Sequence, residues 1–251
     1  MIRTTTTLIL LLLALPVKAD LLVLIHGYLG EAKSWQESGI TRVLERYGWH
    51  HTSHGNKHYR IINLPSEAPI AIQAQYLTKA LTQTRQHSPK EKIILIGHSA
   101  GGVVARMSMV QNPTLNIFAL MTIASPHLGS DLADKALFLS RTPITMMTPF
   151  VGAGTLNRSK QLYADLSTAK PGNLLFWLNV QKHPTSHYVS LLRSDKKGNT
   201  EDSIVPLYSQ DMRNIKQLQK RAISFRLDNS HTLTKSDGNA IIGILRRLNH
   251  Q

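Results

Sequence analysis

The chain has 251 residues, 42% of them hydrophobic, which suits one α/β domain with a sizeable core better than two small domains. It contains no cysteine, so a disulfide framework and a thiolate metal site are excluded. The 29 Lys and Arg residues against 15 Asp and Glu give a formal charge of +14, which favours anionic surfaces such as phospholipid headgroups, but a solvated surface that keeps an exported protein soluble explains it equally well. No zinc-finger spacing, RNA-recognition motif or basic heptad region is present, and we therefore expect no nucleic-acid partner.

Residues 1–19 have the pattern of a cleavable signal peptide. Arg3 precedes a threonine run, ten apolar residues follow from Leu8 to Val17, and small residues stand at Val17 and Ala19, where an exporting peptidase reads the chain. A ten-residue helix crosses only about half of the hydrocarbon core of a bilayer, which disfavours a permanent anchor. We expect cleavage after Ala19 and a periplasmic or secreted mature protein that keeps 27 basic residues and a formal charge of +12.

The rest of the chain predicts strands that alternate with helices. The first strand, 21–25, is apolar throughout, as is typical of a parallel strand buried on both faces. Further strands are predicted at 59–64, 93–96, 117–124, 187–192 and 222–227, and helices around 34–47, 69–86, 103–107 and from about 234. This alternation predicts the α/β class, with a mostly parallel central sheet covered by helices on both faces.

The segment of about 130–186 predicts a small helical cap inserted into the domain of residues 20–251. It contains short amphipathic pieces and an apolar patch from Met146 to Val151, but no clear strand. Compact domains seldom carry structureless loops of this length, so we expect helices laid over the site.

The sequence from Gly97 to Gly101 is a G-x-S-x-G motif, which predicts a nucleophile at Ser99. Apolar β-branched residues come before it and a helical run follows, as in a nucleophile elbow. At such an elbow the serine has a strained backbone and the strand passes close to the helix, so that only small residues fit at Gly97 and Gly101.

A serine nucleophile needs a histidine base and an acid that orients it. In folds built around such an elbow, the acid and then the histidine follow the serine in the chain. His231, just after the strand 222–227, is the predicted base, and Asp202, in the loop after the strand 187–192, is the predicted acid. Three other acids remain open: Asp195, Glu201 and Asp228.

Two further histidines lie near these motifs but do not fit the role of the base. His127 precedes every one of these acids, and His98 lies inside the elbow. We expect His127 to have a structural role in its loop and His98 to pack beside the bend.

An oxyanion hole is predicted from two backbone amides. The residue after the nucleophile, Ala100, supplies one N–H, and Tyr28, in the loop after the first strand, supplies the other. Gly27 and Gly30 let this loop come close to the reacting atoms.

Four histidines between residues 50 and 58 suggest a metal site, but no carboxylate or thiolate cluster accompanies them. The stretch contains Gly55, Asn56 and Lys57 and is typical of a surface loop. We therefore predict no metal and no cofactor.

With these motifs in order, the chain resembles the bacterial triacylglycerol lipases and related esterases of the α/β-hydrolase fold, over nearly the whole mature length. The resemblance rests on five segments: His26–Gly30, Gly97–Gly102, Ser125–Gly129, Asp202–Pro206 and His231. It implies Ser99 as nucleophile, Asp202 and His231 as its partners, and Tyr28 with Ala100 as oxyanion donors. Several secreted lipases carry a disulfide and a calcium ion near the catalytic histidine; this chain has no cysteine, and calcium is not carried over.

The sequence therefore predicts an exported serine hydrolase that cleaves carboxylic esters, with lipid esters favoured by the apolar cap. A phospholipase or an acyltransferase uses the same three side chains and is an alternative from the residues alone. A non-enzymatic alternative is an inactive, basic protein that binds membrane surfaces.

Overall fold

The computed structural model describes residues 20–52, 55–141, 153–194 and 202–249. The predicted signal peptide, the apolar patch from Met146 to Val151, and the rival acids Asp195 and Glu201 lie outside the described residues. Within the described ranges, no helix is long and apolar enough to span a membrane.

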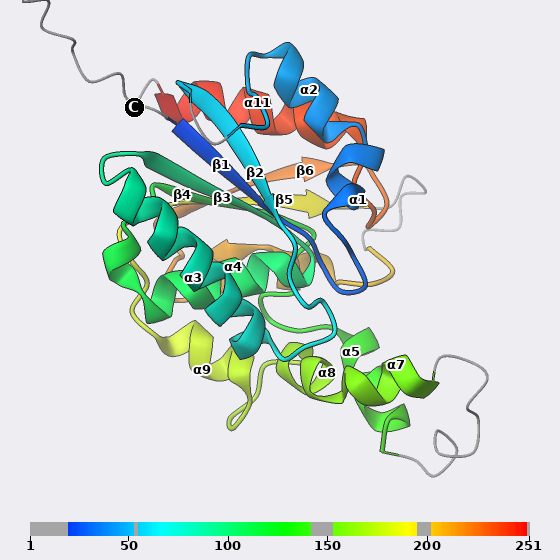
Figure 1. Cartoon of the computed structure of the whole chain (residues 1–251). Helices are drawn as coiled ribbons and strands as arrows, with labels where there is room; N and C mark the ends of the chain where they lie inside the picture. The colour runs from blue at the N-terminus through cyan, green and yellow to red at the C-terminus, as the bar shows by residue number, and fades with distance from the viewer. Residues whose placement is uncertain (1–19, 53–54, 142–152, 195–201, 250–251) are drawn as a thin grey trace, which may run out of the picture.

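A parallel sheet forms the centre of the molecule (Figure 1). In the described residues its six strands are β1 (Asp20–Ile25), β2 (Lys57–Ile62), β3 (Lys92–His98), β4 (Ala119–Ile123), β5 (His187–Arg193) and β6 (Ala222–Leu227). They lie in the order β2-β1-β3-β4-β5-β6, and every neighbouring pair is parallel. The predicted fold class is confirmed.

Helices cover both faces of this sheet (Figure 1). One face carries α3 (Ile70–His87), α4 (Ala100–Gln111) and α9 (Leu174–Val180), and the other carries α1 (Lys33–Glu37), α2 (Ile40–Arg46) and α11 (Lys235–Asn249). Short helical turns occupy Pro113–Leu115, Leu207–Gln210 (α10) and Met212–Asn214.

The composition of β1 follows from this layering. Alternate side chains of a strand point to opposite faces, and Leu21, Val23 and Ile25 pack in the core under α3 and α4. Leu22 and Leu24 pack in the core under α2 and α11. From Leu21 to Ile25 every side chain is buried on one face or the other, which is why the sequence shows no alternation here.

The single helix predicted around 34–47 is two helices in the structure. Gly39, between α1 and α2, has a φ of 80°. This left-handed conformation ends one helix and starts the other at a new angle, and glycine adopts it without the penalty of a Cβ atom. The prediction was wrong because the apolar spacing of the two helices runs on through the glycine.

The predicted cap segment divides into two parts. The helices α5 (Asp131–Leu139), α7 (Ala153–Arg158) and α8 (Lys160–Leu166) lie together beyond the carboxyl ends of the strands (Figure 1). The helix α9 lies beside α4, whose Arg106 donates to Asn179 at 2.7 Å, and its Leu175 and Leu178 share one buried cluster with Leu162 and Leu166 of α8. The bounds of the predicted cap, about 130–186, stay a prediction.

Close packing at the elbow makes Gly101 a test of the fold. A Cβ atom at Gly101 would lie 2.6 Å from the carbonyl oxygen of Ile25, which belongs to the backbone of β1 and cannot move aside. We expect Gly101→Ala to lower the free energy of unfolding by about 3 kcal/mol through overpacking, measured by chemical denaturation. Gly243→Ala is the matched control: this glycine lies in α11 with open space around it, and alanine there should stabilise the helix by about 0.5–1 kcal/mol. Equal effects at the two positions would contradict the packing argument.

Candidate active site

Ser99 stands at the turn between β3 and α4, as the elbow motif predicts. Its φ is 51° and its ψ is −128°, a conformation that non-glycine residues rarely adopt. The backbone N–H of Ser99 donates to the carbonyl of Ile123 in β4 at 2.8 Å, which holds the strained residue at the carboxyl edge of the sheet. Strain of this kind is stored where the surrounding structure fixes it, and functional sites are where it is commonly found.

His231 connects Ser99 to Asp202. The Nε2 atom of His231 lies 3.0 Å from Ser99 Oγ, and its Nδ1 atom lies 2.6 Å from Asp202 Oδ2. The Asp202 side chain is buried, and its other oxygen accepts from the backbone N–H of Ile204 at 2.9 Å. Three residues that are far apart in the sequence are thus in contact in series, Asp202 with His231 and His231 with Ser99.

The rival residues that the structure describes point elsewhere. Asp228 accepts from the hydroxyl of Ser194 at 2.8 Å. His127 is fully buried, and its Nε2 lies 3.1 Å from the hydroxyl of Thr122. Burial holds the pKa of His127 well below its ordinary value, so the ring is neutral and part of the packing.

The loop with Tyr28 lies directly against the nucleophile. A Cβ atom at Gly27 would lie 2.8 Å from the Cβ of Ser99, so only glycine allows this approach. His26 anchors the loop: its Nδ1 lies 3.0 Å from the Gly27 carbonyl, and its Nε2 accepts from the N–H of Leu64 at 2.9 Å. Burial lowers the pKa of His26, which keeps the ring in the neutral form that both contacts require.

Ala100 occupies the other predicted oxyanion position. It is the first residue of α4, and the first N–H groups of a helix have no acceptor within the helix. The helix dipole also places partial positive charge at this end. The N–H of Ala100 is thus a backbone donor directly after Ser99, at the position where an oxyanion hole is predicted.

A cavity of about 280 Å³ opens beside Ser99, under α5 and α8. Most of its lining is apolar and includes Leu132, Ala133, Ala136, Leu162, Leu166 and Val205. The hydroxyl of Tyr163 in α8 contacts the hydroxyl of Tyr28 and so connects the cap to the loop that carries Tyr28. Sequence reasoning missed Tyr163, because nothing in the local pattern of α8 shows which residue faces that loop.

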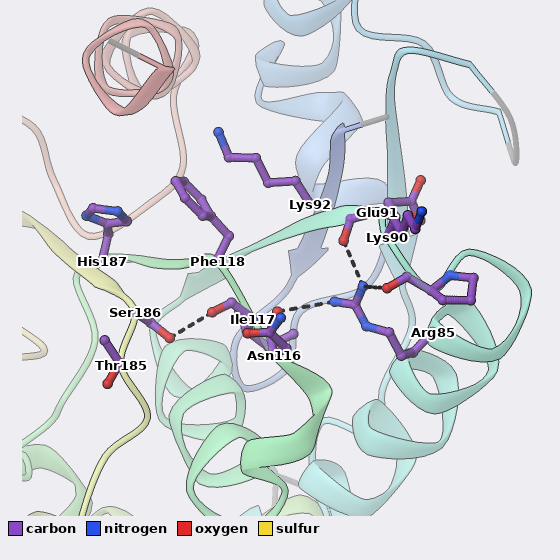
Figure 2. A pocket seen from close by; sticks show the side chains of 11 residues that line it. Arg85, Lys90, Glu91, Lys92, Asn116, Ile117, Phe118, Thr185, Ser186 and His187 are labelled. Carbon is purple, nitrogen blue, oxygen red and sulfur yellow. Dashed lines mark hydrogen bonds between the residues drawn. The ribbon is translucent and has the colours of Figure 1, made fainter. Parts of the chain in front are cut away.

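A second cavity, of about 400 Å³, lies at the opposite edge of the sheet, where β3 and β5 begin (Figure 2). Arg85 donates to backbone carbonyls of its neighbours, among them Pro89 at 2.9 Å and Glu91 at 2.8 Å. Figure 2 shows Arg85 beside Glu91. The hydroxyl of Ser186 donates to the carbonyl of Ile117 at 2.7 Å. We see no arrangement of nucleophile and base among these lining residues.

The histidine-rich stretch is only partly a surface loop. His50 and His51 are exposed, and His54 lies outside the described residues, but His58 belongs to β2 and is buried. Its Nε2 lies 3.1 Å from Glu91 Oε1, and both side chains are almost fully buried. The surface prediction was wrong for His58 because the strand begins earlier than predicted. Among the described residues, no group of three or more potential metal ligands is found.

The parallel sheet, the serine at its elbow and the cap over an apolar cavity define a protein of the α/β-hydrolase fold, of the lipase and esterase type. Solved structures share this fold: the mature Bacillus licheniformis lipase BlEst2 has a TM-score of 0.66 at 18% identity, over 93% of this chain and 92% of that one. The metagenomic carboxyl esterase MGS0156 has a TM-score of 0.62 at 17% identity, over 94% of this chain and 76% of that one. Residues 16–217 match the family model described as "Putative serine esterase (DUF676)", and the chain belongs to this family.

Curated relatives match only a part of the chain. A GPI inositol-deacylase of Cryptococcus neoformans is 34% identical over 67 residues, 25% of this chain and 9% of that protein. Triacylglycerol lipase 2 of Saccharomyces cerevisiae is 33% identical over 75 residues, 29% of this chain and 23% of that protein. The predicted resemblance is therefore shown for the serine esterase family and the lipase-like fold. These two relatives are fungal, so the resemblance to bacterial lipases in particular stays a prediction.

Proposed function

We propose that this protein is an exported serine hydrolase that cleaves carboxylic esters of lipids through an acyl-Ser99 intermediate. The observation that carries the proposal is the chain of contacts from Asp202 through His231 to Ser99, at 2.6 and 3.0 Å. Membership of the serine esterase family supports the same reaction class.

The reaction follows from the proton positions that these contacts impose. An ionised carboxylate only accepts hydrogen bonds, so Nδ1 of His231 is protonated and donates to Asp202. The other nitrogen, Nε2, is unprotonated and faces Ser99. When Ser99 Oγ attacks the ester carbonyl, Nε2 takes the hydroxyl proton, and the N–H groups of Ala100 and Tyr28 stabilise the oxyanion. Nε2 then returns the proton to the leaving alcohol, which departs and leaves the acyl group on Ser99.

Water completes the cycle by the same route. It loses a proton to His231, attacks the acyl carbonyl, and releases the carboxylic acid as Ser99 regains its hydrogen. The acyl group is the part of the substrate that suits the cavity, because the lining beside Ser99 is mostly apolar. The local likeness to proteins named as a triacylglycerol lipase and a GPI inositol-deacylase supports a lipid acyl ester.

Export rests on the signal-peptide pattern of residues 1–19. Cleavage after Ala19 would make Asp20 the new N-terminus. The intact mass of protein recovered from the periplasm or medium should match residues 20–251, and a chain that keeps residues 1–19 would contradict export.

The experiment that tests this function is ester hydrolysis combined with active-site labelling. Purified protein is offered p-nitrophenyl esters of increasing acyl length, and a fluorophosphonate probe is reacted with the folded protein. We expect hydrolysis, and labelling of one residue that peptide mapping identifies as Ser99. Folded protein that is neither labelled nor active would favour the inactive membrane-surface alternative.

A further inference from the structure

The segment that carries His231 lies between the end of β6 and the start of α11, at residues 228–234. In the structure this segment is neither a helix nor a strand. The position of the His231 ring therefore depends on what holds this segment from outside. Side chains from two strands and one helix do so.

Arg193, the last residue of β5, holds the segment on one side. Its side chain is fully buried, and Nη2 donates to Asp237 Oδ2 at 2.6 Å and to the carbonyl of Thr232 at 3.5 Å. Nη1 lies 3.2 Å from the side-chain oxygen of Asn229, in the amide orientation that satisfies its neighbours. One guanidinium thus contacts the chain on both sides of His231.

Asp237 makes this attachment rigid. Its Oδ2 also accepts from the backbone N–H of Thr234 at 2.7 Å, while its own N–H donates to the Thr234 carbonyl at 3.0 Å. Thr234 directly precedes α11, so the carboxylate that accepts its N–H caps the start of this helix. The carboxylate that fixes the helix start is therefore also the partner of the buried guanidinium.

His98, directly before the nucleophile, holds the segment from the side of the elbow. Its Nε2 lies 2.9 Å from the carbonyl oxygen of His231, and a carbonyl only accepts, so Nε2 is the protonated nitrogen. The two imidazole rings lie 5.2 Å apart between centroids. Burial and then repulsion from His231 lower the pKa of His98 to about 3, so the ring stays neutral beside the base.

We propose that His98, together with the Arg193–Asp237 pair, positions the imidazole of His231 against Ser99. These residues do not touch the reacting atoms; they act through the backbone on either side of the base. The inference rests on the proposed function, because positioning is measured as turnover. A displacement of the base by about 1 Å is enough to lower turnover by about 100-fold.

The main test replaces His98 in two ways. His98→Leu keeps the apolar bulk but removes the donor, and His98→Gln keeps an N–H donor at a similar reach. Turnover of a soluble p-nitrophenyl ester is measured per active site titrated with the fluorophosphonate probe. We expect kcat to fall about 10- to 100-fold in His98→Leu with KM nearly unchanged, and to recover in large part in His98→Gln.

A second variant tests the other side of the segment. Removing only one partner of a buried ion pair leaves an uncompensated charge, which is strongly destabilising, whereas apolar replacement of both is often tolerated. The double variant Arg193→Met with Asp237→Leu should therefore fold, as judged by thermal unfolding, and show a lowered kcat per titrated site. His87→Leu, at the exposed end of α3, is the matched histidine control and should leave kcat unchanged.

The outcomes separate the two proposals. If His98 has only a structural role, His98→Leu should lower the fraction of protein molecules that the fluorophosphonate probe titrates, while kcat per titrated site stays at the wild-type value. That result would overturn the positioning role. Equal losses in His98→Leu and His98→Gln would also overturn it, since the donor would not matter. An unlabelled, inactive wild-type protein would overturn the proposed function itself.

Discussion

Replacement of Ser99 by alanine is expected to lower kcat for ester hydrolysis by about four to six orders of magnitude. The nucleophile is lost, and the remaining donors and binding contacts stabilise only the uncatalysed attack of water. Labelling by the fluorophosphonate probe should disappear in the same variant. The fold should survive, because the hydroxyl is replaced by a smaller side chain and the strained backbone of the elbow is held by its own hydrogen bond to Ile123.

A serine far from the site provides the control. Ser186 lies at the opposite edge of the sheet, where its hydroxyl donates to the carbonyl of Ile117 (Figure 2). Ser186→Ala should lose about 1 kcal/mol of stability at most and keep full turnover. Activity retained in Ser99→Ala would remove Ser99 from the mechanism.

Replacement of Asp202 by asparagine should lower kcat by about three to four orders of magnitude. The carboxylate accepts the Nδ1 proton of His231 at 2.6 Å, whereas an amide can turn its NH₂ group toward Nδ1 and favour the other tautomer. The proton then lies on Nε2, which can no longer take one from Ser99. Stopped-flow measurement of the labelling rate should show the same loss as turnover, since both need an activated serine.

Asp228→Asn is the matched control for this variant. Its carboxylate faces the hydroxyl of Ser194 and not an imidazole, so we expect turnover within a few-fold of wild type. A loss in Asp228→Asn as large as in Asp202→Asn would mean that the wrong carboxylate has been assigned.

Most of the sheet could be predicted from local sequence. The strands at 187–192 and 222–227 were predicted within one residue of β5 and β6. β5 is a mostly apolar strand that is buried along its length, whereas β6 lies at the edge of the sheet and alternates apolar with polar residues. Predictions failed where a single residue changed the backbone without changing the pattern. Gly39 divides a continuous apolar spacing into α1 and α2, and the strand around His58 begins inside a stretch that is polar in sequence.

The site divides in the same way. The elbow at Ser99 is a local signal, since the crossing of strand and helix demands small residues at fixed spacing, and a local signal can be recognised in sequence. The choice between Asp202 and its rivals was not local: several acids follow β5, and only the packing of the loops shows that Asp202 contacts His231 and Asp228 contacts Ser194.

What the sequence by itself determined is therefore the order of the elements, the sheet and the place of the elbow, because backbone preference and burial pattern act over a few neighbouring residues. What only the tertiary structure decided is the set of contacts at the carboxyl edge: Tyr163 on Tyr28, His98 on the carbonyl of His231, and Arg193 on Asp237. These contacts join residues 44 to 135 positions apart. No local pattern encodes them, since they arise only when parallel strands bring their following loops to one edge of the sheet.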